Sequence, residues 1–141
     1  MGILRLLTKR TEASPAYDDA TLRERLTDLE YRVTQLGGTE KAYSGEYLHT
    51  QLEGVYHCRI CDAPLFLSDT KFGAGGAWPA FSAPISDATV DKTDDPSIGI
   101  PRTESVCAVC GSHLGHVFPG GPDGGVRYCV NSVSLRFRPN T

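Results

Sequence analysis

Five cysteines are the residues of this chain best able to do chemistry, and their spacing divides them into two groups. Four form two Cys-x-x-Cys pairs, Cys58 with Cys61 and Cys107 with Cys110, separated by a stretch long enough to form a sheet. Two such turns can supply four thiolates to one tetrahedral ion, at about 2.3 Å for zinc. The fifth cysteine, Cys129, has no partner at this spacing and is a candidate reactive thiol.

The two pairs favour a structural zinc site over redox chemistry. In a thioredoxin-type motif the Cys-x-x-Cys pair follows a strand and begins a helix, and neither pair here does so. All four positions are cysteine, so no coordination position stays open for catalysis. We therefore expect a structural Zn²⁺ ion that holds the fold together and takes no part in the reaction.

The sequence around Cys129 alternates as a β-strand would, because side chains at every second position of a strand share one face. The expected core face carries Val126, Tyr128 and Val130. The opposite face carries three polar groups, those of Arg127, Cys129 and Asn131. A neighbouring guanidinium lowers the pKa of a thiol. The apolar positions change parity after Asn131, which predicts a bulge or a strand end there. The alternative is that Cys129 is a small buried core residue.

Histidine and tryptophan supply the other candidate groups. His113 and His116 follow the second cysteine pair, and either imidazole can exchange protons near neutral pH, although a structural role for one of them stays open. We expect His49 and His57 at the surface. The only tryptophan, Trp78, follows a glycine-rich loop, where its indole suits a pocket for a small apolar group or an anchor for the loop in the core.

The composition indicates an ordinary globular protein. Its 141 residues, 40% apolar and 22% charged, suit one domain. A net charge of -3 argues against nucleic-acid binding, which normally needs a basic face. There is no apolar stretch of about 20 residues, and the first ten residues lack the features of a signal peptide. We therefore expect a cytoplasmic protein that binds neither nucleic acid nor a membrane.

We expect a flexible lead-in over residues 1–13 and a domain over residues 14–141. A helix can begin at Ser14-Pro15, and a capping box at Thr27 and Glu30 predicts a break between two short helices near Thr27. One helix face would carry Leu22, Leu26, Leu29 and Val33. Beyond Gly37-Gly38 the helical period ends, and short runs such as residues 54–58 and 64–67 predict a mainly antiparallel β domain.

Several motifs occur together, in order, over roughly residues 26–137. They are residues 26–35, 38–40 and 44–47, both cysteine pairs, Leu65-Phe66, Lys71-Phe72, residues 78–81, Arg102-Thr-Glu104, His113-Leu-Gly-His-Val-Phe118 and Arg127-Tyr-Cys-Val-Asn-Ser132. In this combination the chain resembles the B-type methionine sulfoxide reductases.

The resemblance implies two antiparallel sheets, short helices at the start and a zinc clamp at one end. It also implies reduction of the R epimer of methionine sulfoxide, mainly in peptides or proteins, a protein-repair reaction of oxidative stress. Cys129 would be the nucleophile and would become a sulfenic acid. The other implied site residues are His116 and His113 toward the sulfoxide oxygen, Arg127 and Asn131 for electrostatics and geometry, and Trp78, Phe81 and Phe118 for substrate contact.

Two departures from the family pattern matter. Many members carry a resolving cysteine where this chain has Gly76, so we expect a one-cysteine enzyme. Its reductant would be external: thioredoxin, a glutaredoxin system or a low-molecular-weight thiol. An aspartate that is common in the family two residues after Phe118 is replaced here by Gly120, which should lower activity or move its pH optimum if that carboxylate orients a histidine.

The alternatives to this enzyme are a non-catalytic zinc-clamped binding module and a redox sensor at Cys129. We expect a monomer.

Overall fold

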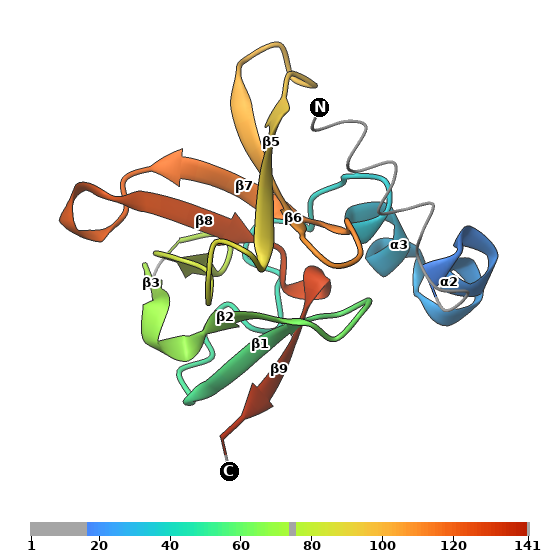
Figure 1. Ribbon diagram of the computed structural model, residues 1–141, viewed down its shortest axis with the longest axis horizontal. Helices are drawn as coiled ribbons and strands as arrows, with labels where there is room; N and C mark the ends of the chain where they lie inside the picture. The colour runs from blue at the N-terminus through green and yellow to red at the C-terminus, as the bar shows by residue number, and fades with distance from the viewer. Residues whose placement is uncertain (1–16, 74–75, 141) are drawn as a thin grey trace.

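A computed structural model describes residues 17–73 and 76–140 of the chain (Figure 1). The expected lead-in over residues 1–13 and the expected helix start at Ser14-Pro15 lie outside the described residues. Within the described ranges two short helices come first and nine strands follow, with three 3-10 helices between them. This order confirms the expected mainly β fold with helices at its start. None of the described helices is long and apolar enough to cross a membrane.

The two helices are α2 (Asp19–Arg25) and α3 (Asp28–Thr34). The expected capping box begins α3. The Thr27 hydroxyl accepts a hydrogen bond from the Glu30 N–H, and the Glu30 carboxylate accepts one from the Thr27 N–H. Both contacts satisfy N–H groups that the helix itself leaves unpaired. The predicted break near Thr27 is confirmed.

The four apolar residues expected on one helix face do not all enter the core. Leu22 and Val33 are buried and Leu26 packs against the core, but Leu29 is 38% exposed. Leu26 ends α2 in an extended conformation. The chain therefore changes direction there, and spacings of three and four residues no longer keep side chains on one face. The prediction was wrong at Leu29 for this reason.

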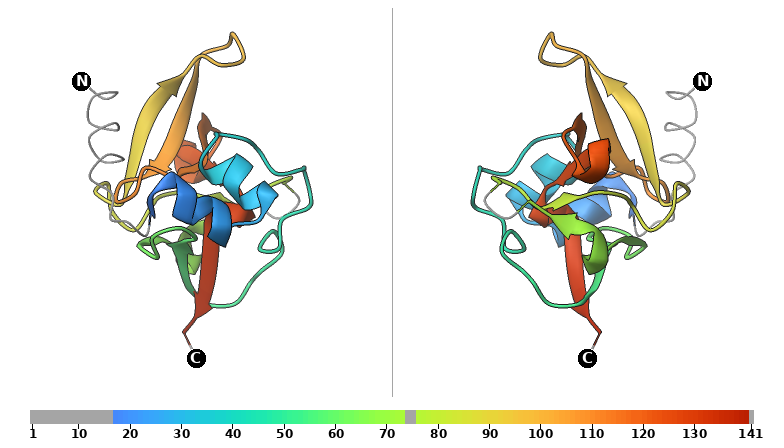
Figure 2. Two further views of the ribbon diagram at one scale, coloured as in Figure 1. Left: turned by 90° about the vertical axis from the view of Figure 1, so that its right-hand side faces the viewer. Right: turned by 90° about the vertical axis from the view of Figure 1, so that its left-hand side faces the viewer.

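Two antiparallel sheets form the body of the molecule, as expected (Figures 1 and 2). The smaller has the order β2-β1-β9 and contains β1 (Gly54–Cys58), β2 (Pro64–Leu67) and β9 (Leu135–Pro139). The larger has the order β3-β4-β8-β7-β6-β5. Its strands are β3 (Lys71–Phe72), β4 (Ala80–Phe81), β5 (Val90–Asp95), β6 (Arg102–Cys107), β7 (His113–Pro119) and β8 (Val126–Val130). Figure 2 shows the β5–β6 hairpin rising away from the other strands.

Aromatic rings from the two sheets meet in one core cluster. The Phe81 ring of the larger sheet stacks on Phe66 of the smaller one with ring centres 4.5 Å apart, and meets Tyr56 edge-on at 5.1 Å. Tyr128 of β8 lies 5.9 Å from Phe66. Aromatic pairs in these geometries add to the free energy gained by burying the rings. The strand that carries Cys129 is therefore held against the smaller sheet.

The alternation predicted for β8 is confirmed over most of the strand. Tyr128 and Val130 are buried, whereas Cys129 is only half-buried and belongs to the opposite face. Val126 departs from the prediction and is 41% exposed, because it begins the strand beyond the reach of the core. The parity change has the expected cause, since the strand ends at Val130 and the 3-10 helix η4 (Ser132–Ser134) follows.

The pairing of β7 with β8 requires glycine at position 115. A Cβ atom added at Gly115 would lie 1.8 Å from the carbonyl oxygen of Cys129, which belongs to the neighbouring strand backbone. We expect Gly115→Ala to lower the free energy of unfolding by about 1–3 kcal/mol or more, measured by denaturant titration. Gly76→Ala is the matched control, because its Cβ would meet nothing closer than 3.4 Å. Equal stability of the two variants would contradict this close approach.

Candidate active site and metal centre

Cys129 lies on β8 between two strands that pair with it directly. His116 of β7 stands opposite it on one side and Ala80 of β4 on the other. Directly opposed residues of antiparallel strands share a face, with Cβ atoms about 4.5–5.5 Å apart. The thiol and the imidazole are therefore neighbours. The same register sets Phe118 opposite Arg127.

The Arg127 guanidinium contacts the thiol. Its Nη1 donates to Cys129 Sγ at 2.6 Å, and its Cζ lies 5.0 Å from the centre of the Phe118 ring. Burial raises the pKa of Cys129 above its ordinary value, and the charge and hydrogen bond of Arg127 lower it only in part. Arg127 thus acts in the predicted direction, but burial is the larger effect.

A bulge in β7 brings the two histidines together, and nothing in the sequence indicated it. Ser105 of β6 pairs with Gly115, but the next residue, Val106, pairs with His113, so β7 has one residue more than β6 at this point. Residues three apart normally face opposite sides of a strand. The extra residue reverses this, and the rings of His113 and His116 meet edge-on with centres 5.4 Å apart.

Each of these histidines has a carboxylate partner. Nε2 of His116 lies 2.7 Å from Asp95 Oδ2, and Nδ1 of His113 lies 2.5 Å from Glu104 Oε2. The pKa of Asp95 lies well below its ordinary value, because the Ser97 hydroxyl, His116 and the Ser97 N–H all donate to it. An ionised carboxylate only accepts hydrogen bonds. Nε2 of His116 therefore carries a hydrogen and donates it to Asp95.

The carboxylate that contacts His116 comes from Asp95 and not from position 120. Gly120 lies beyond the end of β7 in a left-handed conformation, with φ at +97°. Asp95 reaches His116 from β5, which is separated from β7 by β6. It also receives a hydrogen bond from Arg102 at 3.1 Å. Sequence reasoning did not single out Asp95, and it quoted Glu104 in a motif without predicting its contact with His113, because the fold brings both carboxylates to the histidines from separate strands.

A cavity of about 140 Å³ opens at Cys129. The predicted residues in its lining are Trp78, His116, Phe118, Cys129 and Asn131. Thr39 and Arg102 line it as well and were not predicted. This volume is several times the roughly 30 Å³ share of one water molecule. It suits a small group such as the oxidised end of a thioether side chain.

Three predicted residues lie outside this lining. Arg127 reaches the site through its contact with Cys129. His113 is 2% exposed, and its ring contacts the ring of His116 edge-on. Phe81 is fully buried and stacks on Phe66 in the core. The structure therefore gives Phe81 a packing role and places it away from any substrate in the cavity.

Asn131 and Trp78 are joined through one peptide segment. Asn131 Oδ1 accepts from the Glu40 N–H at 2.9 Å, and its Nδ2 donates to the Leu114 carbonyl at 2.9 Å. The Glu40 carbonyl accepts from Trp78 Nε1 at 3.1 Å. Trp78 therefore both lines the cavity and anchors its loop, so the two roles considered for it coexist. Glu40 belongs to the motif of residues 38–40, but the sequence predicted no role for it in the site.

The four paired cysteines form one cluster where β1 and β6 end, at Cys58 and Cys107, and in the turns that follow. Their sulfur atoms all lie within 4.8 Å of one another. Cys58 and Cys110 are 3.7 Å apart and Cys61 and Cys107 are 3.5 Å apart. A tetrahedral ion with sulfur bonds of about 2.3 Å separates its ligands by about 3.8 Å. The cluster could therefore hold one metal ion of this kind.

Comparisons with known proteins agree on one family. Residues 26–139 match the family model described as the SelR domain. Peptide methionine sulfoxide reductase MsrB of Azotobacter vinelandii is 53% identical over 118 residues, which cover 83% of this chain and 89% of that protein. Methionine-R-sulfoxide reductase B3, mitochondrial, of Mus musculus is 51% identical over 124 residues, 87% of this chain and 49% of that protein.

A solved structure shares the fold at much lower identity. The crystal structure of the Mis18 Yippee-like domain matches with a TM-score of 0.52 and 17% identity, over 63% of this chain and 98% of that one. At this identity the likeness concerns the fold alone. The family match covers all the described strands and both cysteine pairs, and the two relatives are identical to this chain at about half of the aligned positions. The chain therefore belongs to the SelR domain family, the B-type methionine sulfoxide reductases.

Proposed function

We propose that the protein reduces the R epimer of methionine sulfoxide in peptides and proteins, with Cys129 as the nucleophile. The carrying observation is the position of the Cys129 thiol: it opens into a cavity, stands opposite His116 and contacts the Arg127 guanidinium at 2.6 Å. The names of the relatives, which are methionine sulfoxide reductases, support this reaction class.

In the proposed step the Cys129 thiolate attacks the sulfoxide sulfur. The sulfoxide oxygen ends on Cys129 Sγ, the thiol proton ends on that oxygen, and methionine leaves as a thioether. The substrate sulfur is reduced by two electrons, and Cys129 is oxidised by two electrons to a sulfenic acid. A sulfenic acid is reversible, so the enzyme can be regenerated by thiols.

We assign the proton transfer to His116, because it lines the cavity and its ring is fixed by Asp95. Proton donation to the sulfoxide oxygen stabilises the negative charge that the oxygen gains as its bond to sulfur weakens. His113 is too buried to meet a substrate, and we assign it to positioning His116. Trp78 and Phe118 would contact the S-methyl group of the substrate.

We propose that an external thiol regenerates Cys129. The chain has five cysteines and four belong to the cluster, so no cysteine is left to form an internal disulfide. Two equivalents of a thiol, from thioredoxin, glutaredoxin or a small thiol, would convert the sulfenic acid back to the thiol and give water and a disulfide. Every site residue comes from one chain, so a monomer suffices.

We propose that Cys58, Cys61, Cys107 and Cys110 bind a structural Zn²⁺ ion, because four sulfurs at this spacing match its preferred ligands. When bound, the ion links the two turns rigidly and leaves no open position for chemistry. Thiolate ligands that must stay reduced fit a compartment such as the cytoplasm.

Two other functions are weaker on specific grounds. Redox-sensor cysteines are accessible and have a low pKa, whereas burial raises the pKa of Cys129. A binding module without catalysis would not need a thiol, an imidazole and a guanidinium assembled on one face of the sheet. Both alternatives are outcomes of the experiment that follows.

Without any reductant, the wild-type protein should form about one methionine per chain from the R epimer of a peptide sulfoxide and none from the S epimer. Cys129→Ser should form none, because the attacking sulfur is gone. Methionine can be counted by mass spectrometry and the sulfenic acid trapped on Cys129. Turnover by Cys129→Ser would remove the assigned nucleophile. No methionine from either epimer, in a folded protein, would favour the binding module.

Asp95→Asn should lower kcat/KM by roughly ten- to 100-fold, because the His116 ring loses the charged partner that holds it in place. Steady-state kinetics measures kcat/KM, and denaturant titration measures the free energy of unfolding. Asp94→Asn, on the exposed face of the same strand, is the matched control. An unchanged kcat/KM together with a lower free energy of unfolding would mean that Asp95 acts only through the fold.

Cys58→Ser should release the metal and lower Tm by roughly 10–20 °C, because the binding of structural zinc contributes to folding directly. Metal content is measured by mass spectrometry and Tm by calorimetry. Cys129→Ser is the control, since it makes the same atom change outside the cluster, and it should keep one zinc per chain. Purified wild-type protein that contains no zinc and loses no stability with a chelator would refute the metal assignment.

A further inference from the structure

Arg102 of β6 lies on the same face of the larger sheet as Cys129. It shares a strand face with Glu104, which stands opposite His116, and His116 in turn stands opposite Cys129. Among the described residues that line the cavity at Cys129, Arg102 is the one with a permanent positive charge. Arg127 is outside that lining and is bonded to the thiol. The reaction proposed above does not use Arg102.

Arg102 and His116 share one carboxylate. Nη2 of Arg102 lies 3.1 Å from Asp95 Oδ2, and Nε2 of His116 lies 2.7 Å from the same oxygen. Because both nitrogens contact one atom, they lie within about 6 Å of each other. The strand order β8-β7-β6 sets His116 between Cys129 and Arg102. An oxygen atom bound beside the His116 ring is therefore within reach of the Arg102 guanidinium.

The Arg102 guanidinium keeps donors for a ligand. It has five N–H groups, and its hydrogen bonds within the described residues come from Nη2, which donates to Asp95 and, at 3.4 Å, to the Ser97 hydroxyl. Nε is buried and has no acceptor among those residues. A buried donor without an acceptor lowers stability, so Arg102 does not lie where its own hydrogen bonds are best satisfied. Its Nη1 is left to bind a ligand.

Other polar groups of the lining are already engaged. Trp78 Nε1 donates to the Glu40 carbonyl, and the Asn131 amide bonds to the backbone through both its oxygen and its nitrogen. The Nε2 hydrogen of His116 is donated to Asp95, and Nδ1 must carry no hydrogen if it is to accept the thiol proton. Before that transfer, the imidazole therefore has no free hydrogen for a sulfoxide oxygen.

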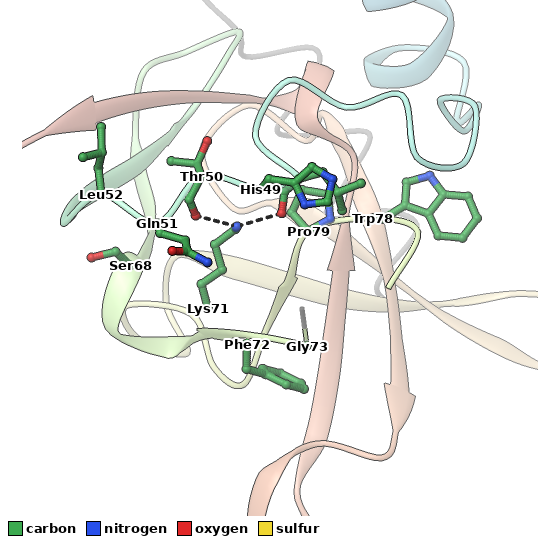
Figure 3. Close-up of a pocket in the computed structure, with 11 residues that line it drawn as sticks. His49, Thr50, Gln51, Leu52, Ser68, Lys71, Phe72, Gly73, Trp78 and Pro79 are labelled. Atoms are coloured by element: carbon green, nitrogen blue, oxygen red, sulfur yellow. Dashed lines mark hydrogen bonds between the residues drawn. The ribbon is translucent and has the colours of Figure 1, made fainter. Parts of the chain in front are cut away.

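Lys71, a cationic side chain at a second cavity of about 240 Å³, does not offer such a contact (Figure 3). Its ammonium nitrogen donates to two carbonyl oxygens of the loop of residues 48–52, at 3.1 Å and 2.9 Å, as the dashed lines show. Lys71 thus ties that loop to β3. Through Phe81, strand register places it in the row of Tyr128, on the opposite face to Cys129. Lys71 therefore cannot meet a sulfoxide at Cys129.

We propose that Arg102 is a further catalytic residue, whose guanidinium donates a hydrogen bond to the oxygen of the bound sulfoxide. The proposal rests on the reductase function above. A sulfoxide oxygen carries partial negative charge and gains more as its bond to sulfur weakens, so a fixed cation beside it stabilises the transition state. Arg102 gives up no proton, because a guanidinium stays charged in proteins. The proton still comes from Cys129 by way of His116, and the products are unchanged.

Two ligands that differ by one oxygen atom test this contact. N-acetylmethionine R-sulfoxide carries the oxygen, and N-acetylmethionine lacks it. Each is titrated into Cys129→Ser protein, which cannot reduce the sulfoxide. The fluorescence of Trp78, the only tryptophan and a residue of the cavity lining, gives Kd. Adding Arg102→Met should weaken sulfoxide binding by about five- to 20-fold and change thioether binding by less than about two-fold.

Turnover gives a second measure in protein that keeps Cys129. Arg102→Met should lower kcat/KM for the R sulfoxide by roughly ten- to 100-fold. Arg102→Lys, which keeps the charge but loses the planar donors, should lower it by less. Arg136→Met is the matched control, because it makes the same substitution at an exposed residue of β9 in the smaller sheet. Denaturant titration shows whether each variant is folded, and Arg102→Lys serves the binding test if Arg102→Met is not.

Equal weakening of both ligands, or no weakening of either, would overturn the contact with the oxygen. So would an effect of Arg102→Met that disappears in Asp95→Asn protein, because Arg102 would then act only through that carboxylate. These results are separable from a failure of the reductase function. A protein that reduces the R sulfoxide equally well with Arg102→Met keeps the function and loses this proposal. A protein that reduces neither epimer, but binds the sulfoxide through Arg102, keeps the contact and loses the reaction.

Discussion

The carboxylate of Glu40, almost fully buried, determines how the face of the sheet that carries Cys129 is held. Its two oxygens accept the backbone N–H groups of Ser132 at 2.9 Å and Val133 at 3.0 Å, where the chain leaves β8. Burial raises the pKa of Glu40, and these two hydrogen bonds oppose that effect. A buried carboxylate is costly unless it is satisfied in this way. Because the backbone of Glu40 also bonds Asn131 and Trp78, one residue holds two residues of the cavity lining and the end of β8.

The cysteine cluster is linked to Ser132, the residue whose N–H Glu40 accepts. Arg59 lies inside the first cysteine pair, and its guanidinium donates to the Ser132 carbonyl at 3.1 Å and the Leu135 carbonyl at 2.7 Å. It also pairs with Glu30 of α3 at 3.2 Å. Ser132 thus accepts from the cysteine turn through its carbonyl and donates to Glu40 through its N–H. An ion in the cluster would therefore keep the start of η4 in place without touching the substrate.

The sequence allowed prediction of what depends on local pattern. The capping box at Thr27, the two cysteine pairs and the strand with Cys129 each follow from neighbouring residues, and the structure confirms them as elements or as a cluster. Contacts that cross the sheet could not be predicted in this way. Asp95 reaches His116 from β5, and the bulge that joins the histidines depends on strand pairing. The buried position of Phe81 could not be predicted either, because a motif names residues together without showing which side of the strand each one faces.

The raised pKa of Cys129 looks unfavourable for a nucleophile, but the proposed reaction explains why it is tolerable. A thiol and a sulfoxide become a sulfenic acid and a thioether, so the step consumes no proton overall. The proton that Cys129 gives up is the one that the transferred oxygen needs. His116 stands directly opposite Cys129 with its ring fixed by Asp95, in a position to carry that proton from sulfur to oxygen. Cys129 would therefore lose its proton when a bound sulfoxide offers an oxygen that can accept it. A raised pKa also lowers the thiolate fraction that peroxide can attack, because the thiolate is the reactive form. In the proposed reaction the sulfoxide oxygen of the substrate itself supplies the acceptor for the thiol proton.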